Sequence, residues 1–502
     1  MSSNRLTYRF GPLERRGILG PVRAGQAASL AFGALLAVGS LNACPNATGA
    51  LLALLLFGLF VALAVLPIRE RTLEQWTPVA CSFILRGLGG HQRWTSEAPG
   101  RGMSVRLGRH RLSRGGRSRE LAEPEPSPPP SLRGAKIVEI AYRERPIGAF
   151  WEQSGRLLTA VLACRVVAFS LLEAEAQERR LARWGLVLSG SASTPIRRIQ
   201  WLERTAPAEG DELARWLHDE RDPSIPLRGA PMIESYLELI GTTARVTQEH
   251  EILVAVQVDA RRVRGGDEPF RVLVEQTERV AQGLEAAEVT VLGALSSRQL
   301  GRVLRTAFDP YARAELAALE AADPGRGGLD RTNAWPLGAS ESWDHYRCDG
   351  SMHATYWIGG WPRVDVSPMF MDALLGRSSA VRTVAVTFAP VPPERSTREV
   401  EAAITRDRAD RELRHRFGQL ETARQRQAQE STLRRESELA AGHGEVRLAG
   451  FVTVSGRDPD DLRRASSEVL EHAARARLEL YRMYGQQADA FTFTLPLCRG
   501  LK

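Results

Sequence analysis

The sequence predicts an α/β (α+β) cytosolic body carried by an N-terminal two-helix transmembrane hairpin. Three observations predict this class. Two uncharged apolar stretches, Ala24–Leu41 and Thr48–Leu66, follow each other closely near the start of the chain. An Arg- and Pro-rich stretch comes after them, and from Ala135 onward strand-like runs alternate with helix-like runs.

The two apolar stretches are long enough to cross a bilayer. Each has roughly 18 residues and as a helix covers about 27 Å, close to the hydrocarbon thickness of a membrane. The turn between them has no basic residue, whereas Arg residues precede the first stretch and follow the second. The positive-inside rule then places both termini in the cytoplasm. We predict a cytosolic segment at 1–23 and a cell-membrane hairpin with two spans at 24–66; a cleaved signal peptide would lack the second span.

Residues 67–94 predict an amphipathic juxtamembrane helix. Leu73, Trp76 and Phe83 recur on one face at helical spacing, and Pro78 is expected to kink or split the helix. Such a segment lies either in the membrane interface or against the soluble body, and the sequence leaves both alternatives open.

Residues 95–134 predict a linker. The stretch 101–119 holds seven Arg with almost no apolar pattern, and a Pro-rich stretch follows it. These residues have too little apolar surface to fold alone. A solvated tether, contact with anionic lipid and contact with DNA all stay open.

The remaining chain predicts two α/β subdomains, 135–310 and 351–502, joined by a loop-rich connection at 311–350. No internal sequence repeat is visible. Residues 394–441 are dense in Arg and Glu and predict one long helix or, preferably, an antiparallel pair. The other expected strands are 155–172, 196–202, 251–260, 289–295, 353–361, 381–391, 445–455 and 491–497, and the other expected helices are 173–188, 231–249, 269–287, 297–307, 367–375 and 459–476.

Composition and motifs argue against an enzyme. The 502 residues carry a net charge of +8. Almost all basic residues are Arg, because Lys occurs only at Lys136 and Lys502. A nucleotide-binding P-loop needs Gly-Lys-Ser or Gly-Lys-Thr, which neither Lys provides. The five Cys have no Cys-x-x-Cys spacing, which disfavours a zinc site or a disulfide framework. We therefore predict no catalytic, cofactor-binding or metal-binding residue.

Short motifs resemble two known families. Residues 8–94 resemble the PrgI family of two-span membrane proteins of conjugation systems, on Tyr8-Arg9-Phe10, the hairpin and Leu73-Glu74-Gln75-Trp76. Residues 135–497 are similar to the N-terminal, non-motor half of type IV secretion ATPases, on Trp361-Pro362, Val384–Pro390, the charged helical region and Phe491–Leu497. The whole chain is also similar to an uncharacterised family of actinobacterial membrane proteins found with mobile elements.

The resemblance implies a structural role. It predicts a non-catalytic inner-membrane subunit of a conjugation or type IV-like secretion apparatus that docks a separate P-loop ATPase and other channel subunits within an oligomeric complex. A membrane component of a type VII secretion system and a membrane-bound enzyme are the alternatives. Aromatic and Pro residues near two strand ends are candidate partner contacts, although core packing explains them as well: Tyr356, Trp357, Trp361, Pro362, Phe491 and Pro496.

Overall fold

A computed structural model of the chain shows two compact units, each described separately below. The body contains Arg93–Met483 and Gln487–Lys502, and the membrane unit contains Pro12–Gln92 and Tyr484–Gln486. The described residues are 24–68, 71–96, 127–142, 146–165, 169–207, 231–235, 238, 248–263, 268–313, 316, 334–362, 366–376, 378–416, 423–440 and 444–501. Most of the predicted linker, and with it the Arg-rich stretch, lies outside them.

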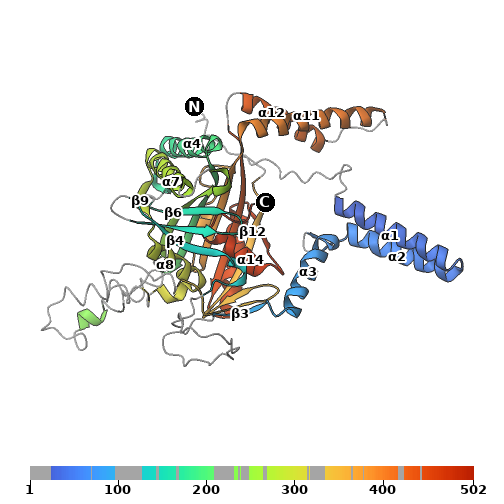
Figure 1. Cartoon of the computed structure of the whole chain (residues 1–502), viewed down its shortest axis with the longest axis horizontal. Helices are drawn as coiled ribbons and strands as arrows, with labels where there is room; N and C mark the ends of the chain where they lie inside the picture. The colour runs from blue at the N-terminus through green and yellow to red at the C-terminus, as the bar shows by residue number, and fades with distance from the viewer. Residues whose placement is uncertain are drawn as a thin grey trace, which may run out of the picture. The chain divides into compact units, whose positions relative to one another are not determined.

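The body is built on one 13-stranded sheet whose described pairings are all antiparallel. Its strand order is β3-β10-β11-β12-β14-β13-β7-β8-β6-β5-β4, with β15 paired to β12 and β9 paired to β6. Figure 1 shows the sheet within the body. The strands are β3 (Arg93–Thr95), β4 (Ala135–Ile140), β5 (Ile147–Glu152), β6 (Leu157–Arg165), β7 (Ile196–Pro207), β8 (Gln248–Asp259), β9 (Thr290–Ala294), β10 (Gly338–Glu341), β11 (Tyr346–Cys348), β12 (Ser351–Gly360), β13 (Val381–Pro390), β14 (Val446–Gly456) and β15 (Glu479–Arg482).

Helices cover both faces of this sheet. On β6, Leu162 packs toward one helix layer and Val161 toward the other, because successive side chains of a strand point to opposite faces. The first layer contains α4 (Ala174–Gly190), α7 (Glu268–Ala286), α10 (Asp372–Leu375) and α13 (Pro459–Arg475). The second contains α8 (Ser297–Phe308), α14 (Gln487–Phe491), the 3-10 turn η8 (Thr492–Thr494) and the segment after it. In Figure 1, α4 and α7 lie on one side of the strands and α8 on the other.

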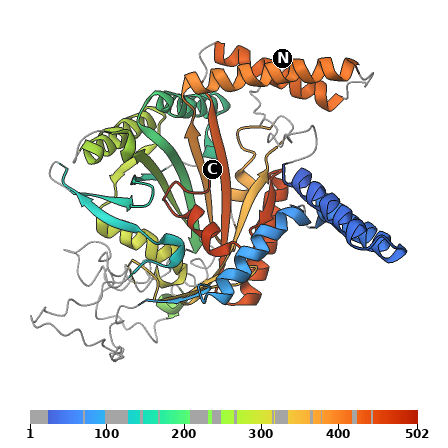
Figure 2. The same cartoon turned by 45° about the vertical axis from the view of Figure 1, so that its right-hand side comes forward.

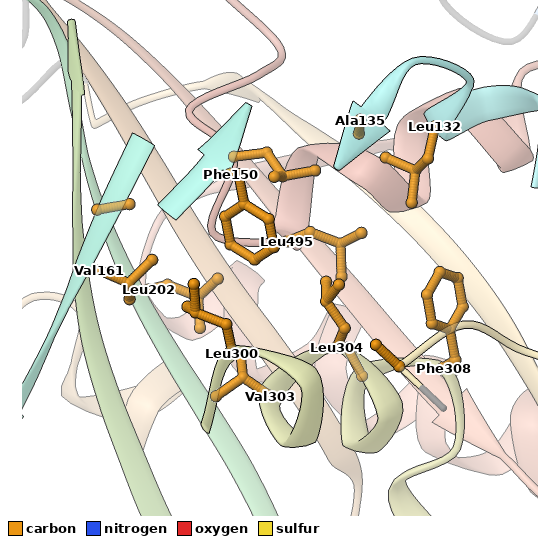
Figure 3. Packing of buried hydrophobic residues seen from close by; sticks show 14 of the residues in the cluster. Leu132, Ala135, Phe150, Val161, Leu202, Leu300, Val303, Leu304, Phe308 and Leu495 are labelled. Atoms are coloured by element: carbon orange, nitrogen blue, oxygen red, sulfur yellow. The ribbon is translucent and has the colours of Figure 1, made fainter. Parts of the chain in front are cut away.

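The second layer closes the larger hydrophobic cluster of the body. Leu300, Leu304 and Phe308 of α8 meet Phe150 of β5 and Leu495 from the C-terminal segment (Figure 3). Leu300, Leu304 and Phe308 are fully buried. Burial of this kind supplies most of the stability of such a layered fold.

The sheet has an internal two-fold pattern that no sequence repeat indicates. Apart from the extra edge strand β3, its strand order corresponds when read outward from the central β7–β13 pair in either direction: β7, β8, β6, β5, β4 on one side and β13, β14, β12, β11, β10 on the other. The helices follow the same scheme. In the first half, α7 separates β8 and β9, which both pair with β6; in the second half, α13 separates β14 and β15, which both pair with β12. The run β8-α7-β9-α8 therefore corresponds to β14-α13-β15-α14.

Individual side chains obey this pattern. The buried residues of α13, Leu462, Ala465, Ser466, Val469 and Ala473, have the same spacing as the buried Leu273, Gln276, Thr277, Val280 and Leu284 of α7. After the two helices, Glu288 and Arg477 both adopt positive φ, 63° and 57°. The repeat is therefore one of burial and backbone geometry, and the residue types themselves differ.

Most predicted elements of the body are present. The expected antiparallel pair is α11 (Pro393–Arg416) and α12 (Ala423–Ala440), drawn in orange in Figure 2. The register shift between Ile358 and Gly360 is the strand bulge that a Gly-Gly pair suggests. Of the expected helix 231–249, only 231–235 and 238 are described as helical. The sheet joins strands of both predicted subdomains, so the boundary between them stays a prediction.

One predicted element was wrong. Residues 491–497 do not form a strand but end α14, form η8 and continue as an extended segment. The hydroxyl of Thr492 donates to Asp489 O of α14, and only the hydroxyl of Thr494 bonds to the sheet, at Thr453. The connection 311–350, predicted to be rich in loop, also contains the short strands β10 and β11. The expected helix 367–375 is reduced to α10. The strands β3, β4, β5 and β15 were not predicted.

The membrane unit consists of α1 (Ala24–Ala43), α2 (Ala47–Val65), the short pair β1 (Pro67–Ile68) and β2 (Arg71–Thr72), and α3 (Leu73–Leu88). The rings of Phe32 and Phe60 meet edge to face with centroids 5.5 Å apart. Gly33 permits this contact, because a Cβ there would lie 2.5 Å from Phe60 Cβ. The amide of Gln26 donates to Ala64 O at 2.8 Å, which satisfies a polar group inside the apolar pair.

Candidate functional site

The hairpin α1–α2 presents apolar side chains outward. Leu51, Leu54 and Leu55 of α2 are 64%, 74% and 59% exposed. Both helices are long and apolar enough to cross a membrane. A helix pair of a soluble protein would bury such residues against a core, so the exposed Leu surface is the surface that lipid contacts.

The six predicted partner residues do not form one patch. Phe491 is 2% exposed and belongs to the cluster of the second helix layer, while Tyr356 is 3% exposed and belongs to the cluster under α13. Pro362 and Pro496 are also buried. Only Trp357 and Trp361 are half-buried; Trp357 lies 5.9 Å from the Tyr481 ring, and Trp361 packs at the edge of the α13 cluster. A partner contact therefore stays a prediction for these two Trp residues.

The C-terminal segment crosses the centre of the sheet and was not recognised from the sequence. Gln200 of β7 donates to Phe493 O at 2.8 Å and accepts from Cys498 N at 2.9 Å. Gln257 of β8 donates to Leu497 O at 3.0 Å. Thr387 of β13 donates to Arg499 O at 3.1 Å. Side chains from both halves of the sheet thus bind the same segment and tie the halves together.

A buried polar cluster occupies the same layer. Arg204 is 1% exposed; its guanidinium donates to Thr306 Oγ1 at 2.7 Å and Val303 O at 3.2 Å, and pairs with Glu251 at 3.1 Å. Burial lowers the pKa of Arg204 below its ordinary value, and Glu251 opposes that shift. This arrangement fastens α8 to β7 and β8.

His353 is the buried titratable group beside this cluster. Its Nδ1 lies 2.8 Å from Ser455 Oγ and its Nε2 lies 2.9 Å from Phe308 O, so the neutral ring donates from Nε2 to the carbonyl. In the two-fold pattern, the position of His353 on β12 is equivalent to that of Thr159 on β6. Thr159 is hydrogen-bonded to its cross-strand neighbour Gln257, as His353 is to its cross-strand neighbour Ser455. Burial lowers the pKa of His353 to about 4, although Asp309 and the Phe308 carbonyl act in the raising direction and Arg204 in the lowering one.

We expect His353 to make stability depend on pH. The unfolded chain takes up a proton near pH 6.5, but the folded one does so only near pH 4, so the stabilisation is complete above pH 6.5 and falls as the pH drops toward 4. The loss is about 3 kcal/mol at most. Urea unfolding at pH 7 and pH 4.5 measures it, with His353→Gln as control. If the His353→Gln chain lost as much unfolding free energy as the parent between pH 7 and pH 4.5, His353 would not be the group responsible.

The described part of the chain shows no group of three or more His, Cys, Asp or Glu that is arranged to hold a metal ion. Burial raises the pKa of Cys164 to about 11 and the pKa of Cys498 further above its ordinary value, so both thiols stay protonated. These two Cys act as packing residues rather than nucleophiles.

A comparison with protein families finds one match that bears on function. Residues 246–358 match the EccE family model, described as a type VII ESX secretion system translocon. The matched part runs from β8 through α7, β9 and α8 to β12, and so spans the end of one half of the sheet and the start of the other. It covers less than a quarter of the chain. No curated protein matches the sequence.

The match changes the interpretation of the resemblance. It supports a membrane protein of secretion-related type, which agrees with the two apolar helices. It favours the type VII alternative over the type IV one, because neither the PrgI-like hairpin nor the ATPase-like body receives support.

Proposed function

We propose that the chain is a membrane subunit of a type VII secretion system, in which the hairpin α1–α2 anchors the protein and the body docks other subunits. The observation that carries this proposal is the EccE match over β8–β12 in a chain that also has two apolar helices. Both features concern a membrane complex, and either one alone is compatible with many other proteins.

The body suits docking better than catalysis. The buried side chains of Arg204 and His353 are covered by α8 and by Phe491 near the C-terminus. The charged pair α11–α12 has exposed ion pairs such as Arg434–Glu438 at 3.1 Å, which contribute little to stability. Such a surface is free to meet a partner. We propose a non-catalytic role, with the termini on the cytoplasmic side and a P-loop ATPase in trans among the partners.

Affinity purification of the tagged full-length chain from native membranes in mild detergent tests this function. We expect other membrane subunits of a type VII system and their ATPase to be enriched over a matched preparation of an unrelated two-span protein. Enrichment of conjugation ATPases instead would favour the type IV interpretation. Recovery of the chain with no secretion component would contradict both.

A further inference from the structure

The helix α3 carries an exposed apolar face. Thr77, Pro78, Cys81, Ile84, Leu85 and Leu88 are all exposed, and at 100° per residue they fall within an arc of about 120°. Ile84, Leu85 and Leu88 are 58%, 67% and 82% exposed. A helix on a soluble protein has the reverse arrangement, with its apolar face inward.

The opposite face of α3 is occupied inside the membrane unit. Arg86 donates to Gly485 O at 2.6 Å, and the Trp76 ring lies 6.0 Å from the ring of Tyr484. Val79 is buried. The predicted apolar stripe with Trp76 and Phe83 therefore faces the unit, and the exposed stripe centred on Cys81 is a second one.

The start of α3 lies at the end of α2. Pro67 and Thr72 are paired across the β1–β2 ladder, so the chain folds back immediately after α2, and paired Cα atoms are only about 5 Å apart. If α2 crosses the bilayer, its last residues reach the membrane surface, and α3 begins at that depth. Val65 and Leu66, 64% and 52% exposed, continue the lipid-facing surface of the hairpin toward α3.

The length and charges of α3 exclude a third span. Its 16 residues cover about 24 Å, less than the roughly 30 Å of a hydrocarbon core. Glu74 stands in its first turn and Arg86 in its last. A short helix with charged ends and one apolar face lies along an interface rather than across it.

We propose that the Cys81 face of α3 is inserted in the lipid headgroup–acyl boundary of the leaflet where α2 ends. The occupant is lipid because α3 follows directly on the exposed apolar end of α2 and begins at its depth. This fixes the rotation of α3 about its own axis. The proposal depends on the hairpin spanning the bilayer and not on which secretion system the chain serves.

Cys81 itself is the probe. Cys44 and Cys81 are exposed whereas Cys164, Cys348 and Cys498 are buried, so the Cys44→Ser chain reacts with a bimane maleimide at Cys81. The labelled full-length protein is placed in phosphatidylcholine–phosphatidylglycerol vesicles. We expect lipids carrying a nitroxide at acyl carbon 5 to reduce its fluorescence about twofold, and aqueous iodide to have little effect.

The control label sits at Ser437→Cys in a Cys44→Ser, Cys81→Ser chain, because Ser437 is exposed on α12 and no span separates the two positions. Iodide should quench this label and the nitroxide lipid should not. In a second variant, Leu85→Glu, lipid quenching at Cys81 should weaken while the hairpin stays inserted. Strong iodide quenching at Cys81 would show that the face lies in water, and quenching by neither agent would show that protein covers it; both results overturn the proposal.

Discussion

Replacing Phe491 by Ala is expected to lower the free energy of unfolding of the body by about 3–5 kcal/mol. The Phe491 ring is 2% exposed and lies between three aromatic rings, with centroid distances of 5.2 Å to Phe308, 4.7 Å to His353 and 5.5 Å to Tyr346. The truncation removes both the buried area and the ring contacts.

The measurement is the urea midpoint of the purified full-length chain, together with the recovery of partners from native membranes. Trp357→Ala is the matched control, because Trp357 is also aromatic but only half-buried. We expect a much smaller shift of the midpoint for this control. If Phe491→Ala kept the parent midpoint but lost the partners, Phe491 would be a partner anchor, as its sequence context suggested, and not a core residue.

The misassigned stretch around Phe491 shows where sequence periodicity misleads. Alternating Phe and Thr at 491–494 is typical of a strand with one buried face. Here Thr492 and Thr494 are buried as well, and Thr494 Oγ1 lies 2.7 Å from Thr453 Oγ1 on β14. The sheet surface that this segment contacts is itself polar at Gln200, Gln257 and Thr453. A local sequence pattern does not indicate which residues a segment will contact after folding.

Other features were readable because their causes are local. The length of an uncharged apolar run indicates whether a helix is long enough to cross lipid. The 3.6-residue spacing of apolar residues indicates the helices α7 and α13 whatever sheet they pack on. The short strands β3, β10 and β11 have three or four residues, and their pairing depends on contacts far along the chain. Arg204 lies in an alternating stretch of β7 where the sequence pattern would equally fit an exposed Arg. Its burial, with 1% of its surface exposed, could therefore not be predicted from the sequence.

The two-fold pattern was hidden for a related reason. Packing requires that each buried position be filled but not by a particular residue, so Gln276 and Ala465 occupy equivalent places, as do Leu284 and Ala473. The polar pair Thr159–Gln257 corresponds to His353–Ser455 with no residue in common. The two halves of the sheet thus keep the same pattern of buried positions although the residue types at these positions differ.

Two Arg residues in the middle of α2, Leu54→Arg with Leu55→Arg, are expected to remove the chain from the membrane. Both Leu side chains are exposed, at 74% and 59%, and therefore face lipid. Each Arg at the centre of a span costs about 2.5–3.5 kcal/mol, or roughly 5–7 kcal/mol together. The fraction of protein that stays in membranes washed with alkaline carbonate measures the effect.

The matched control adds the same charge to the body, through Leu433→Arg and Ser437→Arg on the exposed surface of α12. This chain should remain with the membranes. The contrast separates the hairpin from every other membrane contact, because an interfacial helix such as α3 gives reversible binding that does not resist the wash. If the chain with Arg at 54 and 55 stayed in the washed membranes, α2 would not cross the bilayer. The depth assigned to the start of α3 would then lose its reference point, because that depth is set by the end of α2.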